Sequence, residues 1–154
     1  MKVQVSELIV KYMERLGIDT IFGMPGAHIL PVYDNLYDSS IQSVLAKHEQ
    51  GAAFMACGYN RASGNIGACI TTAGPGATNL LTGLWDAKVD GAPALALTGQ
   101  VQDQVVGVHA FQDIDLEAAF EAVAEFSETV HLTSDHALLM TQAIKTAILQ
   151  RGVG

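Results

Sequence analysis

Basic side chains are scarce in this sequence: 8 Lys and Arg stand against 16 Asp and Glu, a formal net charge of −8 over 154 residues. The few that exist form no cluster, and proteins that bind nucleic acid need clustered basic side chains to contact phosphates. No apolar run reaches the roughly 20 residues of a membrane-spanning helix, and the N-terminus lacks a signal-peptide core. We therefore expect a cytoplasmic protein with neither nucleic acid nor a membrane as its partner.

Metal-binding and nucleophile motifs are also missing. The two cysteines, Cys57 and Cys69, lie in apolar segments, no CxxC occurs, and no two of the five histidines form an HxxxH pair. Buried free thiols and no metal site are the expectation. There is no GxGxxG fingerprint, GxxxxGK[ST] loop or Gly-x-Ser-x-Gly elbow, which disfavours dinucleotide binders, P-loop proteins and α/β hydrolases.

Apolar segments of strand length alternate with segments of helical periodicity. Helices are expected at 5–16, 28–39, 49–63, 75–91, 114–124 and 134–150, and strands at 19–26, 41–49, 65–74, 92–101 and, weakly, 127–132. Such alternation with short connections predicts an α/β fold, a doubly wound parallel sheet with helices on both faces. Residues 1–154 suffice for one such domain. The sequence stops after the last helix, at Gly-Val-Gly, where another strand would be expected, so either a short last strand is missing or the natural chain goes on.

Three expected strand ends carry chemically distinctive residues, in the segments 23–28, 47–50 and 71–79. In sheets of this class ligands bind at the carboxyl ends of the strands. Gly74-Pro75-Gly76 before a helix indicates either a backbone-lined anion site or a tight turn. Glu49 indicates either a helix-dipole acid or a carboxylate near an interface. The second reading is favoured by the small residues that follow it: Gly51, Ala52, Ala53, Ala56, Gly58 and Ala62.

Four stretches in register resemble the N-terminal pyrimidine-binding domain of thiamine-diphosphate enzymes: FGMPGAHILPVYDNL, KHEQGAAFMACGYNRASG, TTAGPGATNLLTGLWDAKVDGAPALALTGQV and HAFQDID. The similarity covers nearly the whole chain, and its nearest group is acetolactate synthase and pyruvate oxidase. It implies part of a thiamine-diphosphate-dependent 2-keto acid decarboxylase or carboligase of the acetolactate synthase kind. The alternatives are a pyruvate oxidase-like or other decarboxylase, with FAD as a possible further cofactor, a non-catalytic assembly relative, and an unrelated nucleotide-binding α/β domain.

The resemblance also implies roles for individual residues. Glu49 is the implied catalytic residue: it contacts N1′ of the cofactor's aminopyrimidine and favours the tautomer that removes the thiazolium C2 proton. The implied cofactor-binding residues are Pro25, Gly26, Glu49, Thr72, Gly74, Gly76 and Asn79. The implied substrate-side residues are Phe111 and Gln112. In this family the diphosphate lies on another domain, so the resemblance replaces the anion-site reading of Gly74-Pro75-Gly76.

Partners follow from the same resemblance. The family's Gly-Asp-Gly…Asn motif, which holds Mg²⁺ and diphosphate, does not occur in these residues, so another domain of the same or a partner chain is expected to supply it. This chain alone is then expected to be inactive, as a piece of a longer chain or of a split enzyme. A homodimer or larger homo-oligomer is expected through helices 50–63 and 75–88. His109 and Asp113 depart from the acetolactate synthase pattern, and EFSETVHL leans toward pyruvate oxidases.

Overall fold

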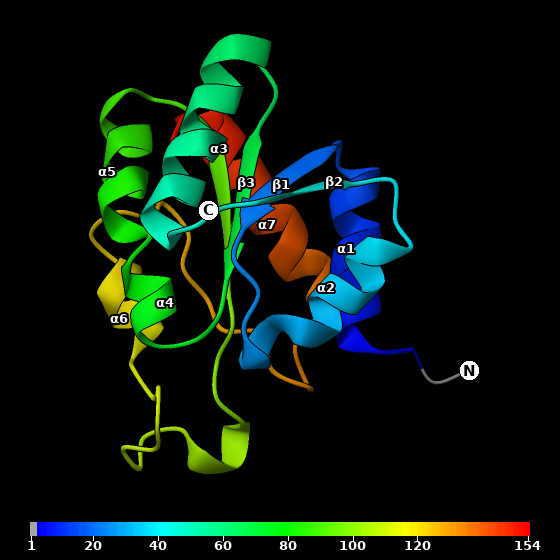
Figure 1. Ribbon diagram of the computed structural model, residues 1–154, viewed down its shortest axis with the longest axis vertical. Coiled ribbons are helices and arrows are strands. Elements are labelled where there is room, and N and C mark those ends of the chain that lie inside the picture. Colours follow the sequence, from blue (N-terminus) through cyan, green and yellow to red (C-terminus); the bar gives the residue numbers. More distant parts are fainter. Residues whose placement is uncertain (1–2) are drawn as a thin grey trace.

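The computed structural model describes residues 3–154 and contains one sheet of four parallel strands (Figure 1). The strands are β1 (Thr20–Gly23), β2 (Gln42–Leu45), β3 (Gly67–Thr71) and β4 (Ala94–Thr98). Their order in the sheet is β2-β1-β3-β4. Helices follow the strands in sequence and lie on both faces, so the predicted doubly wound parallel α/β fold is confirmed.

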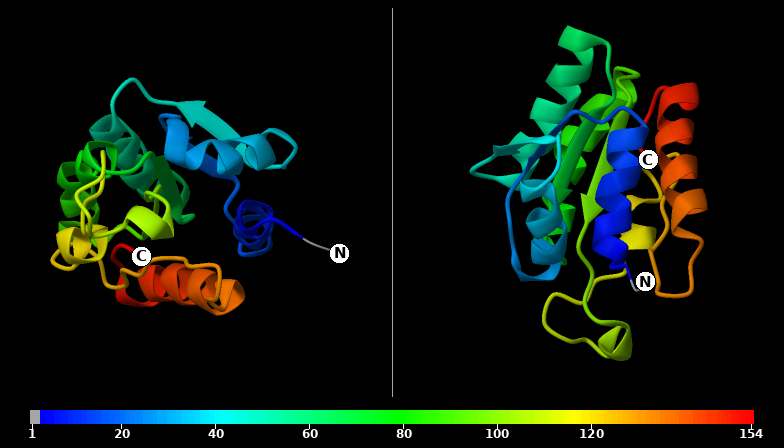
Figure 2. Two further views of the ribbon diagram at one scale, coloured as in Figure 1. Left: turned by 90° about the horizontal axis from the view of Figure 1, so that it is seen from below. Right: turned by 90° about the vertical axis from the view of Figure 1, so that its right-hand side faces the viewer.

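Each face of the sheet has its own set of helices (Figure 2). One face packs against α1 (Val5–Arg15), α2 (Leu30–Tyr37) with the preceding 3-10 turn η1 (Ala27–Ile29), and α7 (His136–Gln150). The other packs against α3 (Glu49–Ser63), α4 (Pro75–Thr78), α5 (Leu81–Val89) and α6 (Leu116–Phe120). The 3-10 turn η2 (Asp103–Val105) lies in the irregular segment after β4. A hydrophobic cluster fills each interface, and β3, buried at all five residues, is shared by both.

The small residues of α3 allow this helix to approach the sheet and α5 unusually closely. A Cβ added to Gly67 of β3 would lie 2.0 Å from the Ala56 carbonyl oxygen. A Cβ added to Gly83 of α5 would lie 2.6 Å from the Ala53 Cβ. Ala53 and Ala56 are fully buried, so half of the small-residue stripe serves contacts inside the domain.

Two predicted elements differ from the structure. The helix expected at 75–91 is two helices, because the chain tightens at Leu80, whose N–H donates to Ala77 O three residues back (3.0 Å). The weak strand at 127–132 does not form. One of its amides, Thr129 N–H, donates instead to the side chain of Glu117 (2.7 Å).

A short strand position follows α7 at the edge of the sheet. Val153 forms parallel bridges with Ala94 of β4 and with Ala124. Ala94 N–H donates to Gly152 O (3.0 Å), and Gly154 N–H donates to Ala94 O (2.9 Å). Residues 152–154 thus add one isolated bridge position, Val153, to the edge of the sheet.

We predict opposite stability effects for two helical glycines. Gly83→Ala forces a methyl group into Ala53, and overpacking of this kind costs about 1–3 kcal/mol. Gly58→Ala in α3 meets nothing within 4 Å in the single chain, and it should stabilise the monomer by about 0.5–1 kcal/mol through lower backbone entropy in the unfolded state. Urea unfolding of the two variants measures both values. A shift of the same sign in both would contradict the packing described for α5.

We predict that neither cysteine reacts with iodoacetamide in the folded chain near neutral pH. Both thiols are free and buried, as expected from the sequence. Burial raises the pKa of Cys69 to about 12, and burial together with the hydrogen bond to Asp86 raises the pKa of Cys57 to about 11. The reactive thiolate is therefore almost absent. Mass spectrometry should find unlabelled native protein and two labels after denaturation in guanidinium chloride, whereas rapid native labelling would refute the burial.

Candidate functional site

The carboxyl ends of three strands lie level with one another. Gly23 at the end of β1 is in register with Leu45 of β2 and with Ile70 of β3. The segments that follow, 24–28, 46–50 and 72–79, therefore leave the sheet at the same edge. This is the edge at which parallel α/β sheets bind their ligands.

Glu49 begins α3 at this edge and is almost entirely buried, with 6% of its surface exposed. Asn79 Nδ2 donates a hydrogen bond to Glu49 Oε2 (3.0 Å). Within residues 3–154, the other oxygen, Oε1, accepts no hydrogen bond. The preceding residue, His48, caps the helix through Nδ1, which accepts from Gln50 N–H (3.2 Å). An ordinary first-turn acid lies in solvent, so its burial and its amide partner set Glu49 apart.

The backbone of Gly76 packs directly against Glu49 and the end of β3. A Cβ at this position would lie 2.7 Å from Thr72 Cγ2, 3.0 Å from Thr71 Oγ1 and 3.4 Å from Glu49 Oε1. The Thr71 hydroxyl is buried and has no hydrogen-bond partner among the described residues. Buried polar atoms are nearly always paired. The region around Gly76 therefore contains unused hydrogen-bonding capacity at both Thr71 and Glu49.

The loop after β1 closes one side of the site through Thr72. A Cβ on Gly26 would lie 2.5 Å from the Thr72 Cβ. His28 Nδ1 lies 3.5 Å from Thr72 Oγ1. Pro25, the residue before Gly26, is exposed. Of the two loop residues that the resemblance named, Gly26 therefore lies against Thr72 and Pro25 precedes it.

Gln112 packs on Gly74 from the irregular segment after β4. Gly74 has φ 64°, and a Cβ there would lie 2.8 Å from Gln112 Cβ. Gln112 itself has φ 67°, a conformation that costs free energy for a residue with a side chain. Phe111, by contrast, is 87% exposed. The structure thus joins Gln112, but not the Phe111 side chain, to the residues around Gly74.

Sequence reasoning assigned no role to two residues that organise this region. Thr71 was visible only as a polar residue at the end of an otherwise apolar strand. Asp113 holds the preceding loop, because its Oδ2 accepts hydrogen bonds from Gly107 N–H (2.8 Å) and His109 N–H (3.2 Å). The position of Asp113 shortly after a glycine-containing loop could have indicated that its carboxylate binds loop amides.

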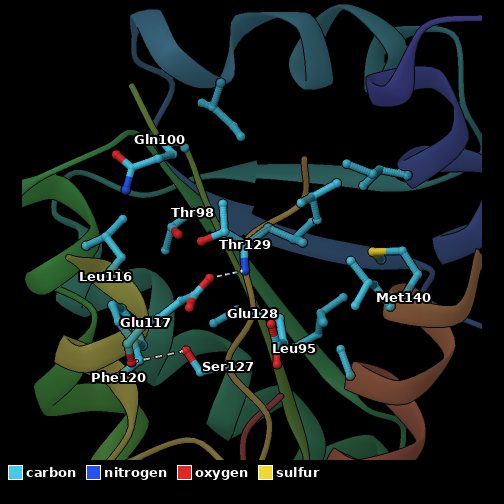
Figure 3. Close-up of a pocket in the computed structure, with 18 of the residues that line it drawn as sticks. Leu95, Thr98, Gln100, Leu116, Glu117, Phe120, Ser127, Glu128, Thr129 and Met140 are labelled. Atoms are coloured by element: carbon cyan, nitrogen blue, oxygen red, sulfur yellow. Dashed lines mark hydrogen bonds between the residues drawn. The ribbon is translucent and has the colours of Figure 1, made fainter. Parts of the chain in front are cut away.

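A cavity of about 370 Å³ lies elsewhere, beside β4 (Figure 3). Its walls come from β4, from α6 and from the 126–130 segment, and Glu49 is not among its lining residues. Within residues 3–154 no group of three or more His, Cys, Asp or Glu side chains could hold a metal ion. None of the helices in this range combines the length and apolarity needed to cross a membrane.

Fold and edge geometry define a parallel α/β domain with a buried carboxylate where the strands end. The chain belongs to the family described as thiamine pyrophosphate enzyme, N-terminal TPP binding domain, whose model matches residues 3–119. The predicted resemblance is thereby confirmed.

Several curated proteins are similar to this chain. The acetolactate synthase isozyme 2 large subunit of Escherichia coli (strain K12) is 44% identical over 142 residues, which are 92% of this chain and 26% of that protein. A probable acetolactate synthase large subunit of Methanocaldococcus jannaschii is 48% identical over 120 residues, 78% of this chain and 20% of that protein. An acetolactate synthase large subunit of Lactococcus lactis is 40% identical over 139 residues, 90% and 24% respectively. The chain spans about a quarter of the length of these relatives, and their names favour the acetolactate synthase reading over the pyruvate oxidase one.

Proposed function

We propose that this chain is the aminopyrimidine-binding part of a cytoplasmic acetolactate synthase-like enzyme that acts on 2-keto acids. The observation that carries the proposal is the buried carboxyl of Glu49, with Oε2 bound to Asn79 and Oε1 without a partner. A ring nitrogen that shares a proton is the kind of ligand such an oxygen fits. Family membership and the names of the relatives support the same assignment.

The residues around Glu49 fit an aromatic ring held at the strand edge. Gly74 and Gly76 present backbone without side chains, which allows a flat ligand to approach closely. Thr72 and the Pro25-Gly26 loop would form the remaining contacts. When bound, thiamine diphosphate supplies the nucleophilic carbon and the electron sink for decarboxylation.

The chain's own contribution to chemistry is control of one proton. Because the Asn79 amide donates to Oε2, the oxygen left to share a proton with a ligand is Oε1, which lies beside Gly76. Only 6% of the surface of Glu49 is exposed, and low-dielectric surroundings strengthen the interaction of a carboxyl group with a ligand. Glu49 is thus placed to pass a proton to and from a ring nitrogen.

The rest of the active site belongs to other parts of the assembly in this proposal. The diphosphate and Mg²⁺ are bound by another domain, of the same chain or of a partner chain, and this chain alone is inactive. Phe111 and Gln112 face the 2-keto acid. A pyruvate oxidase-like reaction is the alternative, and FAD retained by the purified enzyme would identify it.

We further propose a homodimer, or a larger homo-oligomer, through the outer faces of α3 and α5. Gly51 and Gly58 on α3 have open space where a Cβ would lie. Phe54 on α3 and Trp85 on α5 are 41% and 44% exposed, large apolar surfaces for a single domain. Ala53 and Ala56 point inward, so the outward half of the small-residue stripe is the part available to a second copy.

We predict that Glu49→Gln in the complete enzyme slows exchange of the cofactor's C2 proton by about 100-fold or more, the usual contribution of a positioned acid or base. The amide keeps the size of the side chain and loses the transferable proton. Hydrogen–deuterium exchange of bound thiamine diphosphate, followed by NMR, measures the effect directly. The control is Glu14→Gln. It makes the same change at a carboxylate that is not part of the candidate site and that accepts hydrogen bonds from Ser40. Equal exchange rates in both variants would remove Glu49 from the proposed role.

We predict that Gly58→Trp abolishes the dimer without unfolding the domain. The isolated chain has room for a side chain at this position, while a second copy packed on α3 does not. Light scattering on size-exclusion fractions reads the oligomeric state, and circular dichroism reads the fold. Leu149→Trp, on the exposed side of α7, is the matched control. A dimer that survives Gly58→Trp places the contact on another surface.

A further inference from the structure

Thr71 ends β3 with a buried hydroxyl that no described residue binds. None of its surface is exposed, and Thr71 Oγ1 has no hydrogen-bond partner within residues 3–154. The backbone of this residue is paired, since Gly99 N–H donates to Thr71 O (2.9 Å). A buried hydroxyl without a partner loses its hydration without compensation, so such groups are rare in folded proteins. Valine would have nearly the same shape without that cost, so the hydroxyl calls for an explanation.

The side chain of Thr71 points toward the face of the sheet that α3 covers. Successive residues of a strand alternate between the two faces. Ile70 belongs to the hydrophobic cluster between the sheet and α1, α2 and α7, and Cys69 belongs to the cluster on the α3 side. Thr71 therefore points to the α3 side, where α4 lies next to the first turn of α3 (Figure 1).

The Thr71 hydroxyl and one oxygen of Glu49 lie close to the same point beside Gly76. That point is the position a Cβ on Gly76 would take, 3.0 Å from Thr71 Oγ1 and 3.4 Å from Glu49 Oε1. Glu49 Oε2 accepts from the Asn79 amide (3.0 Å), whereas Oε1 accepts no hydrogen bond from residues 3–154. One buried donor and one buried acceptor are thus neighbours without being bonded to each other.

A hydroxyl suits Glu49 in a way that a second amide would not. It can donate to Oε1 when the carboxyl group is ionised, and it can accept from Oε1 when that oxygen carries a proton. The Asn79 nitrogen can only donate. Of these two side chains, only Thr71 can therefore stay bonded in both protonation states, which is what an acid that exchanges a proton needs from its partner.

We propose that Thr71 is a positioning residue for Glu49, and that its hydroxyl pairs with Oε1 as the Asn79 amide pairs with Oε2. Two partners fix the plane of the carboxyl group. A carboxylate oxygen can accept two hydrogen bonds, so Oε1 keeps one position for the ring nitrogen of the cofactor. The pairing requires both side chains to close on each other past Gly76, which has no side chain to separate them. The inference rests on the function proposed for Glu49, and Thr71 acts through Glu49.

Hydrogen exchange of α3 in the full-length protein without cofactor tests the pairing. Thr71→Val keeps the shape of the side chain and removes the hydroxyl. We expect the amides of residues 50–56 to exchange about tenfold faster in this variant, because the buried carboxyl at the start of the helix loses a donor. In a Glu49→Leu background the same substitution should not speed this exchange, because the hydroxyl there has no acceptor to lose. Mass spectrometry of the peptides of α3 reads both comparisons.

Thr98→Val is the matched control. Thr98 is in register with Thr71 on the neighbouring strand β4, so the same change is made one strand away. Exchange in 50–56 should change by less than about twofold in this variant. Unchanged or slower exchange in Thr71→Val overturns the proposal, because the hydroxyl then contributes no bond. Equal acceleration with Glu49 and with leucine at position 49 also overturns it, because the effect then does not pass through the carboxyl group.

The loaded enzyme separates this proposal from the function proposed for Glu49. Exchange of the cofactor's C2 proton should slow about tenfold in Thr71→Val and return to within about twofold of the unmodified enzyme in Thr71→Ser, which restores the hydroxyl. The Kd of thiamine diphosphate should stay unchanged in both. If Glu49→Gln slows C2 exchange and Thr71→Val does not, Thr71 has no positioning role. If Glu49→Gln itself has no effect, the proposed function of Glu49 fails, and hydrogen exchange of α3 alone decides whether the pairing exists.

Discussion

The close contact between α3 and the sheet is the constraint on which the rest of this structure depends. Gly67 lies against the Ala56 carbonyl, and Gly83 lies against Ala53. The first contact holds α3 against the sheet and the second holds it against α5, and its first residue, Glu49, is buried at the strand edge. Larger residues would lift α3, and Glu49 would then become a solvated first-turn acid with little chemical distinction.

Much of the fold could be predicted from the sequence, because segments that pack into a core carry a regular hydrophobic pattern. Alternating apolar and amphipathic segments fixed the parallel sheet, and the boundaries of α3 agree with the prediction of 49–63. Prediction failed where tertiary contacts decide local structure. At Leu80 the chain tightens and splits one expected helix, while Thr129 binds the Glu117 side chain in place of a strand neighbour. Neither contact leaves a trace in hydrophobic periodicity.

The candidate site was predictable in its composition and less so in its geometry. The resemblance named Glu49, Thr72, Gly76 and Asn79, and the structure places them together, although their roles stay predictions. Which side of α3 faces inward could not be read from the sequence, because alanine and glycine suit both a core and an interface. Thr71 and Asp113 received no role because their significance lies in burial, for Thr71, and in hydrogen bonds to loop amides, for Asp113.

The contact between Gly74 and Gln112 has a consequence for anyone who redesigns substrate preference. Gly74 belongs to the turn proposed to border the cofactor and Gln112 to the segment proposed to face the substrate, and a Cβ on Gly74 would lie 2.8 Å from the Gln112 Cβ. Both have positive φ and they pack closely, so a substitution that shifts the backbone of one is expected to disturb the other. Substitutions at these two positions should therefore be non-additive. A library that varies position 112 alone explores one half of a coupled pair.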